Sequence, residues 1–411
     1  MTPSPTALAA PSTSVAEARS SVALVALLCL SIAGSTVSLG AFPALLPEVG
    51  RSANLADWQL GLFAGSFAFA RMVSNIPVGL FLTHHARAAL VLGPVVIAAG
   101  LVLVVGAESF VALLAARALM GLGHTLTMVA GLTTILRRVA GGRLASALNA
   151  FELSAMLGIL AGVVIARTLP ATFSWGAVLA VACAPLAVNI AVVPPLLAWL
   201  RPPPGTPRAP WFARADAGME SAPGSERPRA HTGGVLLASI AGAATAVAYS
   251  TIEQFVVPVR GSRDFGLDRH GIARLLLVMQ ACDTVALLPV GALSDRRGVG
   301  GVLGVVLVVL GAGVALISFG GLTVAYVGAA LFGLGMAGWM LPLGVLRRET
   351  PPAQVAWWTS LYRVGVDGGL FLGPFASGLL AGTAAGLVPG VIAGLLVGVG
   401  ILMLRTEVRR T

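Results

Sequence analysis

Twelve long apolar runs constrain this chain of 411 residues more than any other feature. Each run lasts about 19 to 27 residues, and about 20 apolar residues in a helix cross the hydrocarbon of a bilayer. The runs do not alternate apolar and polar residues as barrel strands would, and a helix satisfies its own backbone hydrogen bonds in lipid. We therefore predict an all-α integral membrane protein. The expected spans are 22–46, 58–82, 88–107, 110–136, 144–166, 175–199, 234–259, 272–293, 302–320, 324–346, 356–381 and 386–404.

Composition agrees with a chain that lies mostly in lipid. Hydrophobic residues make up 57% and charged residues only 10%, whereas soluble domains carry about 25% charged residues. All 26 basic residues are arginine, and with 16 acidic residues they give a net charge of +10. A basic chain can indicate nucleic acid, but these arginines stand singly or in pairs at the ends of apolar runs. The expected partner is the lipid bilayer, with no nucleic acid.

The longest polar stretch divides the chain into two halves. Residues 200–233 are rich in proline and polar residues, too polar to fold alone. The predicted domains are a disordered cytoplasmic tail at 1–21, six-helix bundles at 22–199 and 234–404 joined by this cytoplasmic linker, and a cytoplasmic tail at 405–411.

Arginine counts orient the bundle in the membrane. With the N-terminus inside, seventeen arginines lie in cytoplasmic segments and five in outer loops. Because cytoplasmic loops carry an excess of Arg and Lys, both termini are expected in the cytoplasm. The exception is the loop RGSRDFGLDRHG after the seventh span, which is basic although it is predicted to face outside.

The two halves resemble each other at an offset of 212 residues. Pro77-Val78-Gly79 matches Pro289-Val290-Gly291, and the ALMGLG segment at 118–123 matches ALFGLG at 330–335. Repeated halves are a signature of transporters, in which substrate binds near the midplane between the repeats.

Short motifs make the resemblance specific. The twelve spans, the linker and GALSDRRG after the eighth span resemble the major facilitator superfamily, which carries a G-x-x-x-D-R-x-G-R/K pattern between its second and third spans and often a weaker copy between its eighth and ninth. The eighth-to-ninth copy here is supplied by Gly291, Asp295, Arg296 and Gly298. The second-to-third copy keeps Gly79 but has Thr83 and His84 where the family has Asp and Arg. The resemblance implies an asymmetric gate, in which Asp295 accepts hydrogen bonds from a neighbouring helix and stabilises one access state.

Two further patterns match the same family. The fourth span carries L-x-x-x-R-x-x-x-G-x-G, with Arg117 as its arginine, and the eleventh span carries a Gly/Pro stretch at 369–374. The Gly/Pro motif of antiporters belongs in the fifth span, where this chain has only Gly158 and Gly162. The resemblance implies alternating access, and it associates Arg117 with proton coupling.

Charged residues inside spans are costly and are therefore candidates for mechanism. The candidates for proton coupling or for lining the cavity are Arg71, Arg117, His124, Glu152, Glu253 and Asp283. Glu152 on the next helix is the proposed partner of Arg117. Arg363 and Asp367 are four residues apart and can pair on one helix face. For each residue, a purely structural role in helix packing stays open.

A metal site is a second interpretation of the same spans. His124 and Met128 in the fourth span fall opposite Met336 and Met340 in the tenth at the repeat offset. Imidazole and thioether groups bind Cu(I), but methionine in apolar helices usually serves packing. Copper import therefore remains an alternative, and no bound metal or other cofactor is expected.

The sequence thus predicts a secondary active transporter rather than an enzyme, and the chain lacks the P-loop lysine that an ATP-driven pump requires. The expected activity is proton-coupled efflux of small organic or amphipathic compounds, by a monomer in a bacterial inner membrane. Uptake of a small metabolite by symport, copper import and a non-transporting membrane sensor are the alternatives.

Overall fold

The computed structural model describes residues 12–139, 141–200, 232–351 and 354–408. Its elements, in chain order, are α1 (Ser12–Ser52), α2 (Asp57–Val105), α3 (Phe110–Arg138), α4 (Gly141–Thr168), α5 (Trp175–Cys183), α6 (Leu186–Trp199), α8 (Thr232–Thr251), η1 (Ile252–Val256), α9 (Val257–Arg263), α10 (Arg269–Arg297), α11 (Val299–Phe319), α12 (Leu322–Met336), α13 (Leu341–Glu349), α14 (Val355–Ala384) and α15 (Leu387–Val408). Within those residues every regular element is helical, so the predicted all-α fold is confirmed.

All twelve predicted spans are helices long and apolar enough to cross a membrane. The second and third spans both lie in α2, which loses helical geometry at His85 (φ −127°, ψ 34°) between them. The sixth span is divided into α5 and α6 next to Pro185, and the tenth into α12 and α13. The seventh span contains one turn of π-helix, η1, between α8 and α9.

The first helix begins earlier than expected. The segment 1–21 was predicted as a disordered tail, yet α1 starts at Ser12, and the residues before it lie outside the described part of the chain. The added turns contain Ala and Glu, which favour helix, so the helix continues beyond the apolar run. Of the other predicted connections, linker residues 201–231 and tail residues 409–411 also lie outside the described ranges.

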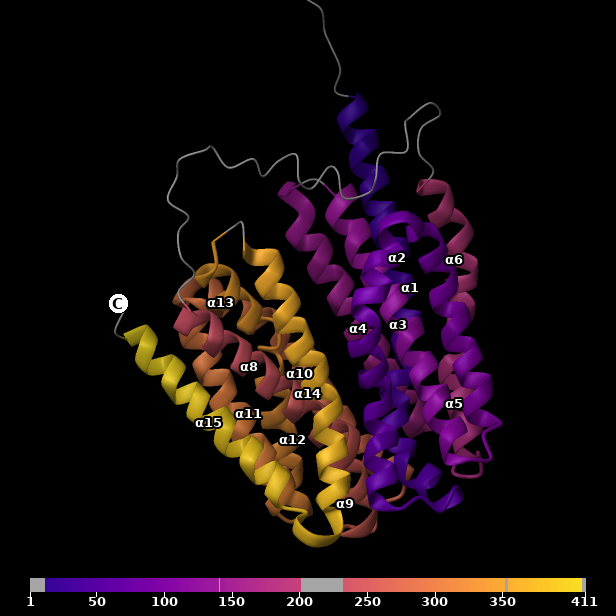
Figure 1. The fold of residues 1–411 in the computed structure, drawn as a ribbon, viewed down its shortest axis with the longest axis vertical. Coiled ribbons are helices and arrows are strands. Elements are labelled where there is room, and N and C mark those ends of the chain that lie inside the picture. The colour runs from indigo at the N-terminus through magenta and orange to yellow at the C-terminus, as the bar shows by residue number, and fades with distance from the viewer. Residues whose placement is uncertain (1–11, 140, 201–231, 352–353, 409–411) are drawn as a thin grey trace, which may run out of the picture.

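The two six-helix halves stand side by side, with the N-terminal half in indigo to magenta and the C-terminal half in orange to yellow (Figure 1). Both halves repeat one close contact. A Cβ added at Gly121 would lie 2.3 Å from the carbonyl oxygen of Phe67, and one at Gly333 would lie 2.2 Å from that of Met279. Each residue of the second contact lies 212 positions after its counterpart. The sequence repeat is therefore also a repeat of helix packing.

Three sets of helices join the halves. Helix α2 packs on α14, α4 packs on α10, and the end of α1 packs on α9 and α10. Within each half, glycines allow the helices to approach closely. A Cβ at Gly162 of α4 would lie 1.9 Å from the carbonyl oxygen of Val37 in α1. Gly158 and Gly162 thus bring α4 onto α1, as small residues do between membrane helices.

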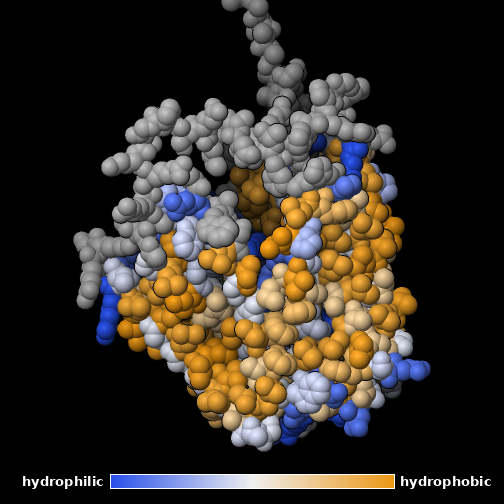
Figure 2. All heavy atoms as spheres, in the orientation of Figure 1, coloured by the Kyte–Doolittle hydropathy of each residue, from blue (hydrophilic) through white to orange (hydrophobic). Residues whose placement is uncertain are grey.

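The two ends of the bundle differ. We call the end where α6 stops and α8 begins the linker end, and the opposite end, with the 53–56, 169–174 and 264–268 connections, the far end. The ribbons of the two halves lie close together at the far end and apart at the linker end (Figure 1). Figure 2 shows a surface dominated by apolar residues and hollowed between the halves towards the linker end.

Candidate functional site

Arg269, the first residue of α10, ties the two halves together at the far end. Its side chain is only 2% exposed. The guanidinium donates to the carbonyl oxygens of Pro170 (2.7 Å) and Phe173 (3.0 Å), and lies 3.4 Å from a carboxylate oxygen of Glu48. Both carbonyls lie in the connection between α4 and α5, and the carbonyl oxygen of Leu169, the residue after α4, accepts from the guanidinium at 3.5 Å. Because a cation is favoured at a helix C-terminus, Arg269 binds both the end of α4 and the connection that follows it.

His270 and Asp268 extend this contact. The His270 ring lies between two acceptors, with Nε2 2.9 Å from the carbonyl oxygen of Leu169 and Nδ1 3.1 Å from the Asp268 carboxylate. The other oxygen of Asp268 accepts from the backbone N–H of Gly271 at 2.9 Å and so caps the start of α10. That hydrogen bond and the one to His270 lower the pKa of Asp268 below its usual 3.8.

A second pair of charges joins the halves at the same end. Arg263, the last residue of α9, lies 2.5 Å from the Asp57 carboxylate at the start of α2. Arg51 donates to the Ser262 hydroxyl at 3.2 Å. Asp57 and Arg269 are 212 residues apart, so the repeat places opposite charges at equivalent helix starts. Each half thus offers the other a complementary charge.

The residues of the predicted gating motif lie at the linker end, Gly79 in α2 and the others at the end of α10. A Cβ at Gly79 or at Gly291 would meet no atom within 4 Å, so neither glycine serves close packing in this conformation. Asp295 and Arg296 are exposed, and no hydrogen bond or ion pair links them to another described residue. Gly298 adopts φ +87° between α10 and α11, where it lets the chain turn. The expected hydrogen bonds to Asp295 are therefore not made here, and the side chains of Thr83 and His84 lie outside what the structure describes.

Near the middle of the bundle, Asp367 of α14 pairs with the opposite half. Its carboxylate lies 3.1 Å from a guanidinium nitrogen of Arg71 in α2 and accepts a hydrogen bond from the Asn75 side chain. The pair predicted between Arg363 and Asp367 is therefore wrong. The i,i+4 rule identified a possible neighbour on the same helix, but the packing of α2 on α14 brings Arg71 to the buried carboxylate instead.

Glu253 lies in η1, the turn of π-helix in the seventh span, and is buried. Its carboxylate accepts from the Gln280 side chain at 2.6 Å and is hydrogen-bonded to the Tyr249 hydroxyl. Tyr249 in turn contacts the Trp339 ring at a centroid distance of 6.0 Å. A π-helical turn is costly and is frequent at functional sites.

Asp283 lies one turn after Gln280 on α10 and is also buried, at 6% exposure. One of its carboxylate oxygens has no hydrogen-bond partner among the described residues. The charge of Glu152, on α4 of the opposite half, acts on it. Arg363 and Arg71 are the cations that act on Glu152, which is only half-buried.

Arg117 has a different partner from the one expected. Its guanidinium carbon lies 3.5 Å from the centroid of the Phe42 ring and 5.1 Å from that of Phe67. It forms no ion pair with Glu152, and its Nε and Nη1 have no hydrogen-bond partner in the described structure. Arg117 therefore lies in a cation–π contact within its own half, and the pairing with Glu152 is wrong.

The candidate copper ligands do not come together. His124 packs against Phe67 with ring centroids 5.5 Å apart. Met128 packs in a different apolar cluster, and Met336 lies in the large core that extends through the C-terminal half. Met340 is 45% exposed. The expected alignment failed because the chain leaves the helix between α12 and α13, so Met340 does not continue the face of Met336.

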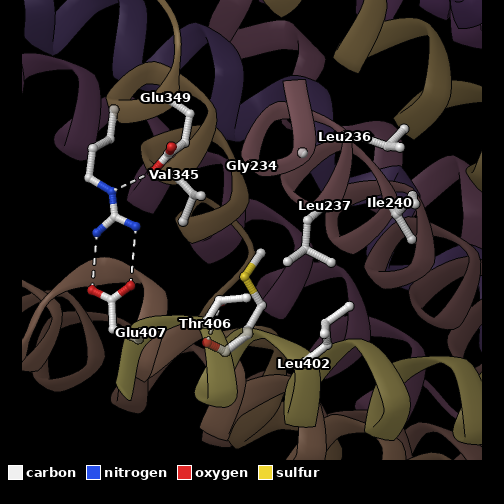
Figure 3. A pocket seen from close by; sticks show the side chains of 12 residues that line it. Gly234, Leu236, Leu237, Ile240, Val345, Glu349, Leu402, Thr406 and Glu407 are labelled. Carbon is white, nitrogen blue, oxygen red and sulfur yellow. Dashed lines mark hydrogen bonds and ion pairs between the residues drawn. The ribbon is translucent and has the colours of Figure 1, made fainter. Parts of the chain in front are cut away.

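A cavity of about 450 Å³ opens within the C-terminal half, between α8, α13 and α15 (Figure 3). Apolar side chains such as Leu237 and Met403 line it, and Arg348 binds both carboxylate oxygens of Glu407 at 3.1 and 3.2 Å beside it. All three helices belong to one half, so this cavity lies apart from the surfaces where the halves meet.

Comparisons with known proteins agree with this architecture. The family described as Major Facilitator Superfamily matches residues 24–260. The nucleoside transporter NupG has 14% identity and a TM-score of 0.67, covering 93% of this chain and 99% of its own. A POT family transporter in complex with 5-aminolevulinic acid has 11% identity and a TM-score of 0.76, over 94% and 96%. A bacterial homolog to the human lysosomal transporter Spinster, in an inward-facing and unoccupied conformation, has 17% identity and a TM-score of 0.65, over 95% and 92%. No curated protein matches the sequence.

Sequence reasoning missed the far-end residues Arg269, Glu48 and Asp57. The available signal was the basic loop after the seventh span, which violates the arginine bias. Its arginines have partners in the structure: Arg263 and Arg269 bind the opposite half, and Arg260 donates to the Gly320 carbonyl at 2.7 Å.

Proposed function

Because the chain belongs to the major facilitator superfamily, we propose that it is a proton-coupled secondary transporter that exports small organic or amphipathic compounds by alternating access. Membrane transport itself follows from the family, whose members are generally not enzymes. The proton as coupling ion, the direction and the kind of substrate are our proposals.

One observation carries the proton coupling: carboxyl groups are buried where the halves meet. Asp283 and Glu253 lie in the bundle interior, and neither forms an ion pair with a described arginine. An unpaired carboxylate is costly in lipid-embedded protein, whereas a protonated one is neutral. Uptake and release of a proton at these groups would therefore change the stability of each access state.

The unequal ends support alternating access about this centre. Polar contacts hold the far end closed, while the hollow between the halves lies towards the linker end, where the uncovered surface is mostly apolar (Figure 2). If the linker faces the cytoplasm, as the arginine bias favours, this conformation is open to the cytoplasm. An apolar hollow on that side suits capture of amphipathic compounds for export.

Proteoliposomes with an imposed pH gradient test the proposal. We expect compounds that are transported to move protons, measured with an internal pH dye, and Glu253→Gln to abolish that coupling. Exposed Glu108, changed to Gln, provides the matched control, and its proton flux should be that of the unaltered protein. Transport that persists without a gradient and without any pH change would remove proton coupling.

Symport of a small metabolite is the second candidate, because the same carboxyls suit either direction. The proton and the substrate then move together. If an inward proton gradient drives substrate into the proteoliposomes, symport is favoured. If the same gradient drives substrate out of them, efflux is favoured.

A further inference from the structure

Two repeat-related contacts join the halves, and their charges differ. At the α2–α14 contact, Arg71 meets Asp367, so a base faces an acid. The position equivalent to Arg71 in the second repeat, 212 residues later, is Asp283. Asp283 lies on α10, which packs on α4 at the second contact. The charge that acts on Asp283 there is that of Glu152. The α4–α10 contact therefore brings two carboxyl groups together, whereas the repeat-related α2–α14 contact has an ion pair.

Asp283 lacks the partners that a buried carboxylate requires. It is 6% exposed, and its Oδ1 has no hydrogen-bond partner among the described residues. Leaving such a charged group unpaired in a protein interior is strongly destabilising. Asp367 also has one oxygen without a hydrogen bond, but Arg71 pairs with that oxygen and Asn75 donates to the other. Asp283 has no such cationic partner among the described residues.

The charges around Asp283 add up to a deficit of cations. Four carboxyl groups lie at or near the two contacts (Glu152, Glu253, Asp283 and Asp367), with two guanidinium groups, those of Arg71 and Arg363. Arg71 is bound to Asp367, and Arg363 acts on Glu152. Glu253 has only neutral donors, from Gln280 and Tyr249. Neither Asp283 nor Glu253 therefore has a cationic partner among the described residues.

Aromatic rings adjoin the same acids. Tyr249 is hydrogen-bonded to Glu253, and its ring packs edge-on against Trp339. Aromatic faces attract organic cations, most strongly where the contact is desolvated. Carboxylates together with aromatic rings suit a cation with an apolar body better than a small hydrated ion. Because Glu152 is half-buried, the group of acids is open on one side.

We propose that Asp283, with Glu152 and Glu253, binds the charged centre of a monovalent organic cation, and that the transported compounds are amines or other lipophilic cations. This inference rests on the proposed transport function and names the substrate class of the same site. Protons neutralise the acids when no cation is bound, so entry of one cation displaces one proton and the charge of the site is conserved.

Binding to the purified full-length protein in detergent tests the proposal directly. The probe is tetraphenylphosphonium, whose charge does not change with pH, and tetraphenylborate is its match in shape with the opposite charge. We expect saturable binding of the cation only, with release of protons into weakly buffered solution and weaker binding as the pH falls. Equal binding of both ions, or cation binding without proton release at any pH, overturns the proposal.

Variants locate the site. Asp283→Asn should weaken binding of tetraphenylphosphonium by about 30-fold or more, because it removes a buried charge partner. Asp283→Glu keeps the charge and should retain binding, which separates loss of charge from loss of folding. Asp264→Asn removes an exposed carboxylate at the far end and is the matched control. Undiminished binding by folded Asp283→Asn places the cation elsewhere and refutes the assignment.

Proteoliposomes distinguish failure of this inference from failure of the proposed function. If only neutral or anionic compounds move protons, the transporter is proton-coupled but the cation site is wrong. If tetraphenylphosphonium binds and depends on Asp283 but no compound moves protons, the cation site stands and the proton coupling is wrong.

Discussion

The two ends of the bundle use arginine and carboxylate side chains in opposite ways. At the far end, Arg269, Arg263 and Arg51 each bind a group of the other half. At the linker end, Asp295 and Arg296 are exposed and bind no described residue, and Gly79 and Gly291 face open space. The two ends therefore differ in which contacts between the halves are made. Contacts between the halves are made at the far end, and the linker end has polar groups able to make such contacts when the far end opens.

Arginine contacts with carbonyls near helix ends occur both within one half and between the halves. Arg87 donates to the Leu200 carbonyl at the end of α6, and Arg260 to the Gly320 carbonyl at the end of α11. Each of those bonds stays within one half and can persist throughout a transport cycle. Arg269 makes the same kind of bond across the halves, to the carbonyls that follow α4. Opening the far end must break it.

Removal of this contact should have the largest effect. Arg269→Ala leaves the carbonyls after α4 and the Glu48 carboxylate without their buried donor, and losing one partner of a buried pair costs about 3–5 kcal/mol. We expect the population to shift strongly towards the conformation with the far end open. Spin labels at Glu108→Cys and Ala385→Cys, one in each half at the far end, report the shift as a longer distance.

The matched control is Arg274→Ala, on the same helix. Arg274 is exposed and binds no described residue of the opposite half, so its removal should leave the label distance unchanged. The labels require replacement of the three free cysteines, Cys29, Cys183 and Cys282. An unchanged distance in folded Arg269→Ala would mean that the carbonyl contacts do not hold the far end closed.

Asp295 should have the next largest effect, in the opposite direction. It binds no described residue in this conformation, so Asp295→Asn should leave the far-end-closed conformation as stable as before. If Asp295 accepts charge-assisted hydrogen bonds once the linker end closes, the variant weakens that state by about 1.5–3 kcal/mol. The same labels should then report a smaller far-end-open fraction, and equal fractions in both proteins would refute a latch role.

Asp268 supplies a pH dependence confined to acid. Its pKa lies below the usual 3.8 because Gly271 and His270 bind the charged form. A group with a lowered folded-state pKa contributes stability above its unfolded pKa, and that contribution is lost as the pH falls through the folded value. We expect α10 to lose an N-cap, about 1 kcal/mol, only below about pH 4. Asp268→Ala should remove that loss, measured by thermal unfolding between pH 6 and 3, with His270→Gln separating the contribution of the imidazole.

Much of this molecule follows from local sequence, and the rest depends on contacts between distant segments. The spans, the repeat and the buried acids Glu253 and Asp283 were predictable because a charge inside an apolar run is conspicuous. The partner of Asp367 was not, because periodicity on one helix favours Arg363 while the packing of α2 on α14 selects Arg71. The contacts of Arg269 could not be predicted for a similar reason. Its partners are backbone carbonyls of the other half, and a backbone carbonyl has no sequence signature.

The exposed pair between Asp57 and Arg263 should have the smallest effect and tests whether the far end depends on charge or on burial. The two side chains are 29% and 53% exposed, and exposed pairs contribute about 0.2–1 kcal/mol. Asp57→Asn and Arg263→Gln, singly and together, should therefore change the label distances only slightly, and 1 M salt should abolish the difference because it screens exposed charges. Arg269→Ala should keep its large effect at the same salt, since that guanidinium is buried. If instead the exposed pair dominates and Arg269→Ala becomes neutral in salt, the far end is held by screened surface charge rather than by the buried Arg269 contact, and the contrast between the two ends becomes one of electrostatics alone.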